Sequence, residues 1–383
     1  MYRRTTRLAL FLFAVVPALA ACGDDGGDQP IDAPPGAIDA PPGAIDAPLD
    51  GAPAWHAPDC TMVTGTGAVT FTHDEGLTVA PRDTTLTGVK YTFGIAALDT
   101  PNVLYVAHDQ RILRSTDAGC TWADIGEAPG LVTLVAAGDR AYGFVDNDTA
   151  LYRITGTTIT PLRAHSTGVM GMAADARDPA HVRLVDANGQ IQDSTDGGDT
   201  FTPLKRTPPI DPGIYRGAFS PLDLDHVMVG TAVAGAYVTT DAGMTWTKST
   251  GLSTGNANAM NFSMSPADAD VVWATGVDLV DSSKHAWRST DGGLTFTSAF
   301  DNADRTIVNG MPLFAHPTDA DVLYATFGTY FQGYGTDIYK YDAGTGMVTT
   351  THQPFHDALA ITFLPGDPSW MYLGITNEQI GGF

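Results

Sequence analysis

The sequence is short of positive charge and of glutamate. It carries 20 lysine and arginine residues against 43 aspartate and glutamate residues, a formal net charge of -23, and its three glutamates are Glu75, Glu127 and Glu378. Nucleic acids and anionic lipid surfaces require a basic patch on their protein partner. The charge balance therefore excludes both as partners. Abundant threonine, glycine and aspartate favour strands and turns over long helices.

Metal-binding signatures are also scarce. No Cys-x-x-Cys pair occurs, and the acidic stretch Asp146-Asn-Asp148 lacks the glycine and glutamate of a full calcium loop. We therefore expect no metal site and no cofactor.

The long apolar run of the chain lies at its N-terminus. Arg3, Arg4 and Arg7 precede the apolar segment 8–20, which is short for a membrane span and ends in Leu19-Ala-Ala-Cys22. This segment resembles a bacterial lipobox, in which the cysteine is lipidated and becomes the N-terminus. We expect residues 1–21 to be a lipoprotein signal peptide. Cys22 would then anchor an exported chain to a bacterial membrane, at the periplasmic face or the cell surface; an ordinary signal peptide is the alternative.

Residues 22–58 have the composition of a spacer. An Ile-Asp-Ala-Pro-Pro-Gly-Ala unit begins, in slightly decayed form, at Ile31, Ile38 and Ile45. Such a segment has too few large apolar residues to offset the entropy of ordering, and Pro-Pro pairs favour extended polyproline II. We expect a disordered, semi-stiff linker that leads into one large domain over residues 59–383.

Two further cysteines, Cys60 and Cys120, lie in that domain. In an exported protein they suggest a disulfide that pins the N-terminal stretch to the first repeat, while two separate thiols are the alternative.

An eight-residue pattern, Ser/Thr-x-Asp-x-Gly-x-Thr-Trp/Phe, occurs four times. Its aspartates are Asp117, Asp196, Asp241 and Asp291, separated by 79, 45 and 50 residues. An aspartate followed two residues later by glycine is turn chemistry, because the carboxylate accepts backbone N–H groups and glycine adopts positive φ at little cost. Each copy therefore predicts a hairpin turn, followed by an aromatic residue that plugs the hairpin: Trp122, Phe201, Trp246 and Phe296.

The pattern resembles the Asp-box, or bacterial neuraminidase repeat. That repeat occurs in sialidases, in the propeller domain of sortilin-like receptors, in xyloglucanase-type glycosidases and in photosystem assembly factors. The resemblance implies a β-propeller with the aspartate turns at the blade periphery, away from the ligand face. It implies no single function, because these families carry out unrelated functions on one fold.

A period of about 40–50 residues with several strands per unit is typical of propeller blades. We predict an all-β fold of seven four-stranded antiparallel blades, with six as the fallback. The expected blades cover residues 91–128, 131–164, 169–207, 215–252, 257–301 and 308–354, the second without the pattern. Residues 356–383 supply only two strands, so we expect the strands 68–72 and 77–79 to complete the last blade and close the ring.

The residues at the start of each inner strand are the candidates for ligand contact around the central channel. We single out seven of them as the candidate site: Tyr91, Tyr215, Arg216, Asn261, Asn309, His356 and Asp357. Aromatic and amide groups would suit a sugar or a peptide. A His–Asp pair can serve as a general base, but no nucleophile motif accompanies it, so we assign no catalytic residue.

We therefore expect a monomeric, non-enzymatic binding or scaffold propeller for an unknown protein or glycan. It would touch the membrane through its lipid anchor alone. The alternative is a sialidase-like or xyloglucanase-like glycoside hydrolase. The propeller has few arginines for a sialidase site, the Phe/Tyr-Arg-Ile-Pro sequence that often opens sialidase propellers is absent, and the many aspartates are explained by turns.

Overall fold

The protein is described here by a computed structural model, which covers residues 54–60, 69–77, 80–81, 92–164, 167–204, 206–209, 213–253, 255–303, 305–308, 310–328, 336–353 and 357–376. At residues 69–70, 80–81, 92–93, 328, 336, 353, 357–359 and 375–376 the description is limited to the backbone. The chain divides into two compact units, Met1–Ala47 and Pro48–Phe383. All described residues belong to the second unit.

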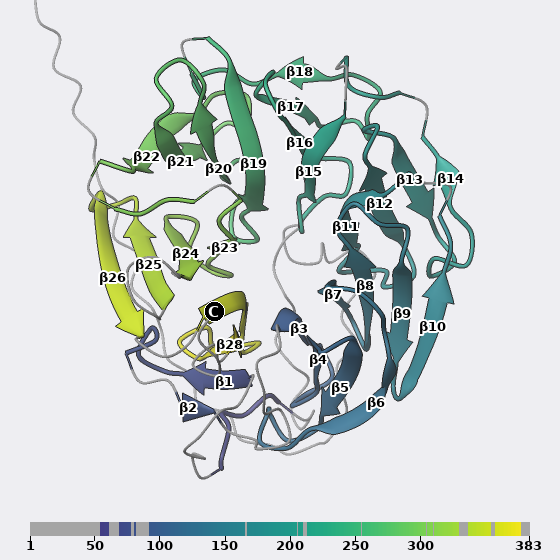
Figure 1. The fold of residues 1–383 in the computed structure, drawn as a ribbon. Helices are drawn as coiled ribbons and strands as arrows, with labels where there is room; N and C mark the ends of the chain where they lie inside the picture. The colour runs from purple at the N-terminus through teal and green to yellow at the C-terminus, as the bar shows by residue number, and fades with distance from the viewer. Residues whose placement is uncertain are drawn as a thin grey trace, which may run out of the picture. The chain divides into compact units, whose positions relative to one another are not determined.

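Seven antiparallel sheets of four strands each follow one another around a ring (Figure 1). This confirms the predicted seven-bladed β-propeller. Strands are the regular elements of the described residues. No helix in this part of the chain is long and apolar enough to cross a bilayer.

In each of the first four blades, the order of the strands from the inside of the ring outward is their order in the chain. Blade one contains β3 (Thr92–Ala97), β4 (Leu104–His108), β5 (Arg111–Ser115) and β6 (Ala123–Glu127). Blade two contains β7 (Val132–Ala137), β8 (Arg140–Val145), β9 (Leu151–Thr155) and β10 (Thr158–Leu162). Blade three contains β11 (Val169–Ala174), β12 (Val182–Asp186), β13 (Ile191–Ser194) and β14 (Thr202–Pro203). Blade four contains β15 (Ile214–Phe219), β16 (Val227–Thr231), β17 (Ala236–Thr239) and β18 (Thr247–Lys248).

The last three blades complete the ring. Blade five contains β19 (Ala257–Met264), β20 (Val272–Asp278), β21 (Lys284–Ser289) and β22 (Thr297–Asp301). Blade six contains β23 (Leu313–Ala315), β24 (Val322–Gly328), β25 (Thr336–Asp342) and β26 (Met347–Gln353). Blade seven contains β27 (Asp357–Phe363) and β28 (Met371–Thr376) from the C-terminal part of the chain, with β1 (Val69–Thr72) and β2 (Ala80–Pro81) from the N-terminal part.

Blade seven is composite, as predicted. Strand β1 pairs with β28 in register from Val69↔Gly374 to Thr72↔Met371, so the two ends of the propeller sequence share one sheet (Figure 1). The outermost strand is a correction: we predicted it at residues 77–79, but β2 begins at Ala80, and Leu77 belongs to the preceding turn. Residues 78–79 lie outside the described part.

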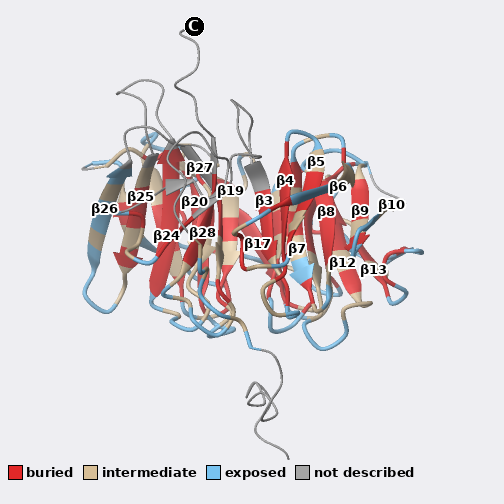
Figure 2. Ribbon diagram, turned by 90° about the horizontal axis from the view of Figure 1, so that it is seen from below, coloured by how far each residue is buried: buried red, intermediate tan, exposed pale blue. Residues whose placement is uncertain are grey.

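The hydrophobic core is divided among the seams between blades. Seven clusters of buried side chains occur among the described residues, and each joins two neighbouring blades. Second strands such as β4 and β16 are buried along their whole length because each lies between two other blades. Figure 2 shows this burial along the middle of the blades, with exposed residues in the turns. The blades are therefore stabilised by their neighbours rather than individually.

Glycines allow the inner strands to approach closely. A Cβ added to Gly171 on β11 would lie 2.1 Å from the main-chain oxygen of Gly217 on β15. Any side chain at Gly171 would push these two inner strands apart.

The four aspartate turns share one set of hydrogen bonds. In the turn of Asp196, the Ser194 hydroxyl donates to Oδ1 (2.8 Å), and Thr200 donates its N–H to Oδ1 (2.9 Å) and its hydroxyl to Oδ2 (2.5 Å). The N–H of Gly198 donates to the Ser194 hydroxyl (2.8 Å). The turn is thus satisfied by its own side chains, as the sequence pattern predicted. Of the four aromatic plugs, Trp122, Phe201 and Phe296 are buried and Trp246 is only half-buried.

A fifth aspartate turn, missed in the sequence, lies in blade seven. Thr72 donates its hydroxyl to Asp74 Oδ1 (2.6 Å), and the N–H of Gly76 donates to the same hydroxyl (2.9 Å). Its sequence, Thr72-His-Asp-Glu-Gly-Leu-Thr-Val79, ends in valine rather than an aromatic residue, which hid it. The N-terminal strands therefore bring the same turn as the internal blades.

The N-terminal segment is also tied to blade one. Cys60 and Cys120 are joined by a disulfide with a Cα–Cα distance of 5.8 Å, and the Trp55 indole N–H donates to the Leu98 carbonyl (2.9 Å). The segment before β1 is thus fixed to the first aspartate turn.

Acid should weaken the aspartate turns. The Thr200 hydroxyl and N–H lower the pKa of Asp196 from its ordinary 3.8 to about 2. A carboxylate with a lowered pKa stabilises the fold fully above its unfolded pKa, and this contribution is lost as the pH falls from 3.8 towards 2. We expect Asp196→Asn to melt below the unmodified protein at pH 6, with the gap closing between pH 4 and 2. Thermal melts across this range measure it, and a gap that stays constant with pH would contradict the assignment.

Candidate binding site at the channel mouth

A cavity of about 510 Å³ lies on the ring axis, among the inner strands. Its lining comes from the inner strands of six blades and from loops that lead into or out of them: Gly94, Ile95, Leu131, Thr133, Leu134, Val145, Asp146, Arg216, Asn261, Gly310, Pro312, Leu313, Phe314, Ala360 and Ile361. Most of these residues are apolar, while a few polar side chains lie at the start of the strands. This is the usual make-up of a ligand site.

A β-bulge recurs near the start of five inner strands. The register of the inner strand against its neighbour shifts at one extra residue in blades one, three, four, five and seven: Phe93, Met170, Tyr215, Met260 and Leu359. Bulges redirect side chains and are common beside functional sites. The residue after the bulge is small in three blades, but it is Arg216 in blade four and Asn261 in blade five.

Arg216 is held by a carboxylate from another blade. Its Nη1 contacts both oxygens of Asp146, which follows β8 in blade two. The ion pair therefore connects blades two and four, which are not neighbours in the ring. The Arg216 side chain is 27% exposed and the Asp146 side chain 44% exposed. An ion pair this open to water contributes little to stability, on the order of 0–1 kcal/mol, so it can be exchanged for a ligand at small cost.

Asn261 is fixed by two hydrogen bonds. Its Nδ2 donates to the Met311 carbonyl (3.1 Å), and its Oδ1 accepts the N–H of Phe262 (3.0 Å). The amide therefore joins the inner strand of blade five to the entry of blade six. It shapes the cavity wall more than it offers free hydrogen-bonding groups.

The structure brings together part of the predicted site. Arg216 and Asn261 line one cavity, and Tyr215 lies beside it with 47% of its surface exposed. Asp357 is the first residue of β27 and is described by its backbone alone, while Tyr91, Asn309 and His356 lie outside the described residues. Asp146 was missed as a site residue, since its contact with Arg216 spans 70 positions of sequence.

Exposed apolar side chains surround the mouth. Leu131 precedes β7, Val233 lies between β16 and β17, and Val280 lies between β20 and β21; they are 54%, 54% and 62% exposed. All three are in loops at the end where inner strands begin, and Tyr215 lies at the same end, as the second residue of β15. We call Leu131, Tyr215, Val233 and Val280 the mouth group. Exposed apolar groups of this kind mark interaction surfaces.

Nothing described at the mouth resembles a metal centre. Across the described residues, no group of three or more His, Cys, Asp or Glu side chains could hold a metal ion. His352 and His356 are four positions apart, a spacing that suits two ligands on a helix, but His352 lies on strand β26, where its ring contacts Asp337 (2.6 Å). Several other arginines join blades: Arg183, for example, contacts Asp193 of its own blade and Asp225 of blade four.

No family model matches the chain. A curated protein does: the dispase autolysis-inducing protein of Streptomyces mobaraensis is 46% identical over 346 residues, which cover 86% of this chain and 92% of that protein. The chain belongs to the family of this protein. The similarity covers most of both chains.

Solved structures of low sequence identity share the fold. YCF48 from Cyanidioschyzon merolae has a TM-score of 0.54 and 13% identity, covering 75% of this chain and 95% of that one. The GH74 xyloglucanase from Xanthomonas campestris has a TM-score of 0.55 and 14% identity, covering 77% of this chain and 53% of the enzyme. The chain thus spans about half the length of that enzyme, and likenesses at this identity show the propeller alone.

Proposed function

We propose that this chain is a non-enzymatic binding propeller whose channel mouth contacts a protein partner, a protease whose self-digestion it promotes. The observation that carries the proposal is the mouth itself: an apolar cavity with an exchangeable Arg216–Asp146 pair, surrounded by the exposed mouth group. The name of the relative, which describes induced autolysis of dispase, supports a protease as the partner. Aromatic and arginine side chains are the residues that most often dominate a protein interface.

Binding can promote autolysis without any chemistry by the propeller. A partner that exchanges between a closed and an opened conformation shifts toward the one that the propeller binds more tightly, and the shift equals the difference in binding free energy. If the mouth holds a segment of the protease that is accessible only in the opened form, a second protease molecule can cut there. The propeller needs no catalytic residue for this effect.

The cavity does not favour the glycoside hydrolase alternative. Hydrolysis of a glycosidic bond uses two carboxyl groups on either side of the bond. Among the described lining residues of the cavity, Asp146 is the sole carboxylate, and Arg216 holds it. What the chain shares with sialidases and sortilin-like receptors is therefore the aspartate turn, and this likeness is no argument for hydrolase activity.

Changing the mouth should abolish the effect on the protease. We expect Tyr215→Ala with Arg216→Ala to weaken binding to dispase by at least about thirtyfold, because truncation of even one interface anchor costs about 2 kcal/mol. The rate of dispase self-digestion at a fixed propeller concentration should fall toward its value without propeller. The matched control is Leu222→Ala with Met347→Ala, two exposed apolar residues on the opposite face, one in the turn between β15 and β16 and one at the start of β26.

Biolayer interferometry gives the affinity and gel densitometry gives the digestion rate. If the control variant loses the effect and the mouth variant keeps it, the mouth is not the binding surface. If purified propeller releases reducing sugar from a glycoside panel, the non-enzymatic account is wrong.

We further propose that Cys22 anchors the protein to a bacterial membrane as a monomer, with no cofactor. The spacer would hold the propeller away from the bilayer, by up to on the order of 100 Å when extended as polyproline II. We expect the protein made in its host to partition into the detergent phase of Triton X-114. Cys22→Ser should move it to the aqueous phase, and equal partitioning of both forms would remove the lipid anchor from the account.

A further inference from the structure

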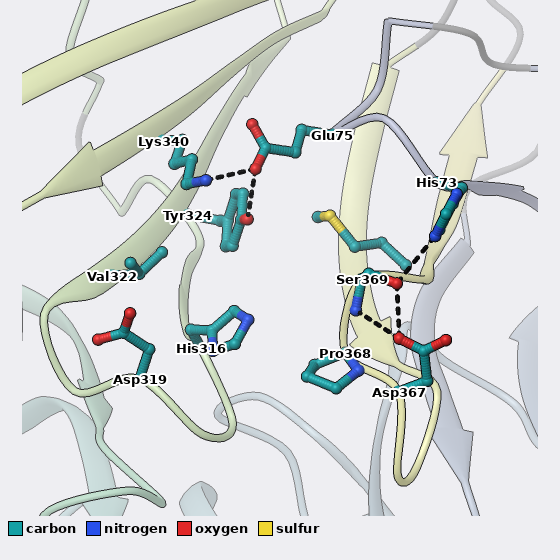
Figure 3. Close-up of a pocket in the computed structure, with 11 residues that line it drawn as sticks. His73, Glu75, His316, Asp319, Val322, Tyr324, Lys340, Asp367, Pro368 and Ser369 are labelled. Carbon is teal, nitrogen blue, oxygen red and sulfur yellow. Dashed lines mark hydrogen bonds and ion pairs between the residues drawn. The ribbon is translucent and has the colours of Figure 1, made fainter.

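A second cavity, of about 410 Å³, lies at the seam between blade six and the composite blade seven (Figure 3). Its lining comes from the turn between β1 and β2, from the turns that follow β23 and β27, and from strands β24, β25 and β28: His73, Glu75, His316, Asp319, Val322, Tyr324, Lys340, Asp367, Pro368, Ser369 and Met371. These turns lie on the face opposite the channel mouth, because each follows an inner or a third strand. The seam pocket is therefore separate from the proposed protein-binding surface.

Glu75 occupies a position where the other aspartate turns have no functional group. The residue before the turn glycine has positive φ in all five turns, and it is Ala118, Gly197, Ala242 or Gly292 in the other four. Glu75 has φ 58°. A left-handed conformation is costly for a residue with a long side chain, and the turn itself does not require glutamate. Its carboxylate points into the seam pocket (Figure 3).

Glu75 meets a hydrogen-bonding arrangement that differs from that of three other seams. Tyr105, Tyr142 and Tyr372 donate their hydroxyls to main-chain carbonyls of the next blade, those of Gly156, Pro179 and Ala118. Tyr324 instead donates to Glu75 Oε1 (3.4 Å), and Lys340 Nζ contacts the same oxygen. An ammonium donor and a carboxylate acceptor thus lie side by side at one end of the pocket.

The other end of the pocket is built on Ser369. Its hydroxyl donates to Asp367 Oδ1 (2.5 Å) and lies 2.9 Å from His73 Nε2. Because the serine proton goes to Asp367, the His73 ring donates to Ser369 rather than taking its proton, and the three residues do not form an activated nucleophile. With both of these protons already engaged, the group presents acceptor oxygens to the pocket.

His316 supplies a neutral donor between the two ends. Its Nδ1 accepts the N–H of Thr318 (3.3 Å), which places the ring proton on Nε2, and burial lowers its pKa below 6.5. Figure 3 shows the ring turned into the pocket.

The carboxylates of the pocket differ in their partners. Glu75 forms an ion pair with Lys340, whereas Asp319 Oδ1 accepts the N–H of Asp321 (3.0 Å) and Asp367 Oδ1 accepts the hydroxyl of Ser369. With three carboxylates and one ammonium in the lining, an anionic ligand is disfavoured.

We propose that the seam pocket binds an uncharged sugar of one or two residues. Neighbouring sugar hydroxyls donate and accept at once, which fits the adjacent Lys340 donor and Glu75 acceptor, while Ser369 and Asp367 add acceptor oxygens at the other end. Val322, Pro368 and Met371 supply apolar surface for the C–H groups of the ring. The volume lies in the range of small-ligand sites, about 300–1,000 Å³.

Isothermal titration of the propeller with cellobiose, maltose, lactose and N,N′-diacetylchitobiose tests this, with spermidine and galacturonic acid as charged probes. We expect at least one uncharged disaccharide to bind and Glu75→Ala to weaken it by about tenfold or more, the effect of a lost charge-assisted hydrogen bond. Alanine occupies this position in two other turns, so Glu75→Ala should keep the fold, and an unchanged melting temperature verifies it. Lys340→Gln is a second variant with the same expectation.

Tyr215→Ala with Arg216→Ala should leave sugar binding unchanged, which separates this site from the channel mouth. The proposal is overturned if no uncharged disaccharide binds, if spermidine alone binds, or if Glu75→Ala and Lys340→Gln both bind the sugar as the unmodified protein does.

Discussion

Trp273→Ala is expected to lower the free energy of unfolding by about 3–5 kcal/mol, the usual cost of truncating a large aromatic residue in a core. Trp273 is fully buried on β20, contacts Tyr341 of blade six edge-on at 5.6 Å between ring centroids, and lies under the Arg288 guanidinium at 5.3 Å. Arg288 in turn contacts Asp321 of blade six. The substitution would therefore empty the core of one seam and remove the surface on which a second inter-blade contact rests.

Trp273→Phe is the matched control. The indole Nε1 of Trp273 is buried without a hydrogen-bond partner among the described residues, so removing it leaves no new unpaired group. We expect phenylalanine to lose no more than about half of the stability that alanine loses. Guanidinium unfolding followed by circular dichroism measures both, and equal losses would show that the ring surface is not what stabilises this seam.

Replacing Cys60 and Cys120 by serine is expected to cost about 4 kcal/mol, the chain-entropy value for closing a loop of this length. The bond spans 60 positions of sequence and fixes the segment before β1 to the first aspartate turn. Without it, the N-terminal strands of blade seven should detach more readily, because they would then be held only by noncovalent contacts such as the β1–β28 pairing and the Glu75–Lys340 ion pair.

The thermal midpoint of the double serine variant, compared with that of the oxidised protein, measures the effect. Glu75→Ala serves as the control, since it weakens the same segment at an exposed contact and should change the midpoint little. If the double serine variant has the same thermal midpoint as the oxidised protein, the disulfide is not needed to hold the N-terminal strands in blade seven.

The repeat pattern allowed the fold to be predicted because each aspartate turn is local chemistry. Ser194, Asp196 and Thr200 lie within seven positions and satisfy one another, so their spacing is visible in the sequence. The composite blade followed from the shortage of strands after residue 356. The fifth turn escaped because its last position holds valine, although the Thr72 and Asp74 contacts are the same.

The site could be predicted only in part because it depends on contacts between distant segments. Arg216 and Asn261 were found from their place at the start of inner strands. The contact between Asp146 and Arg216 could not be predicted, since it depends on how blades two and four are placed in the ring. The β-bulges that turn these residues toward the channel are likewise a matter of strand register, which the sequence pattern does not specify.

The central claim is that the channel mouth is the surface that binds a protein partner. Hydrogen–deuterium exchange of the propeller, alone and with excess dispase, tests it most directly. The account predicts slower exchange in the loops of the mouth face, at residues 129–131, 145–150, 213–216, 231–235 and 278–283. Slower exchange confined to the aspartate turns on the opposite face, or no change anywhere, would contradict it.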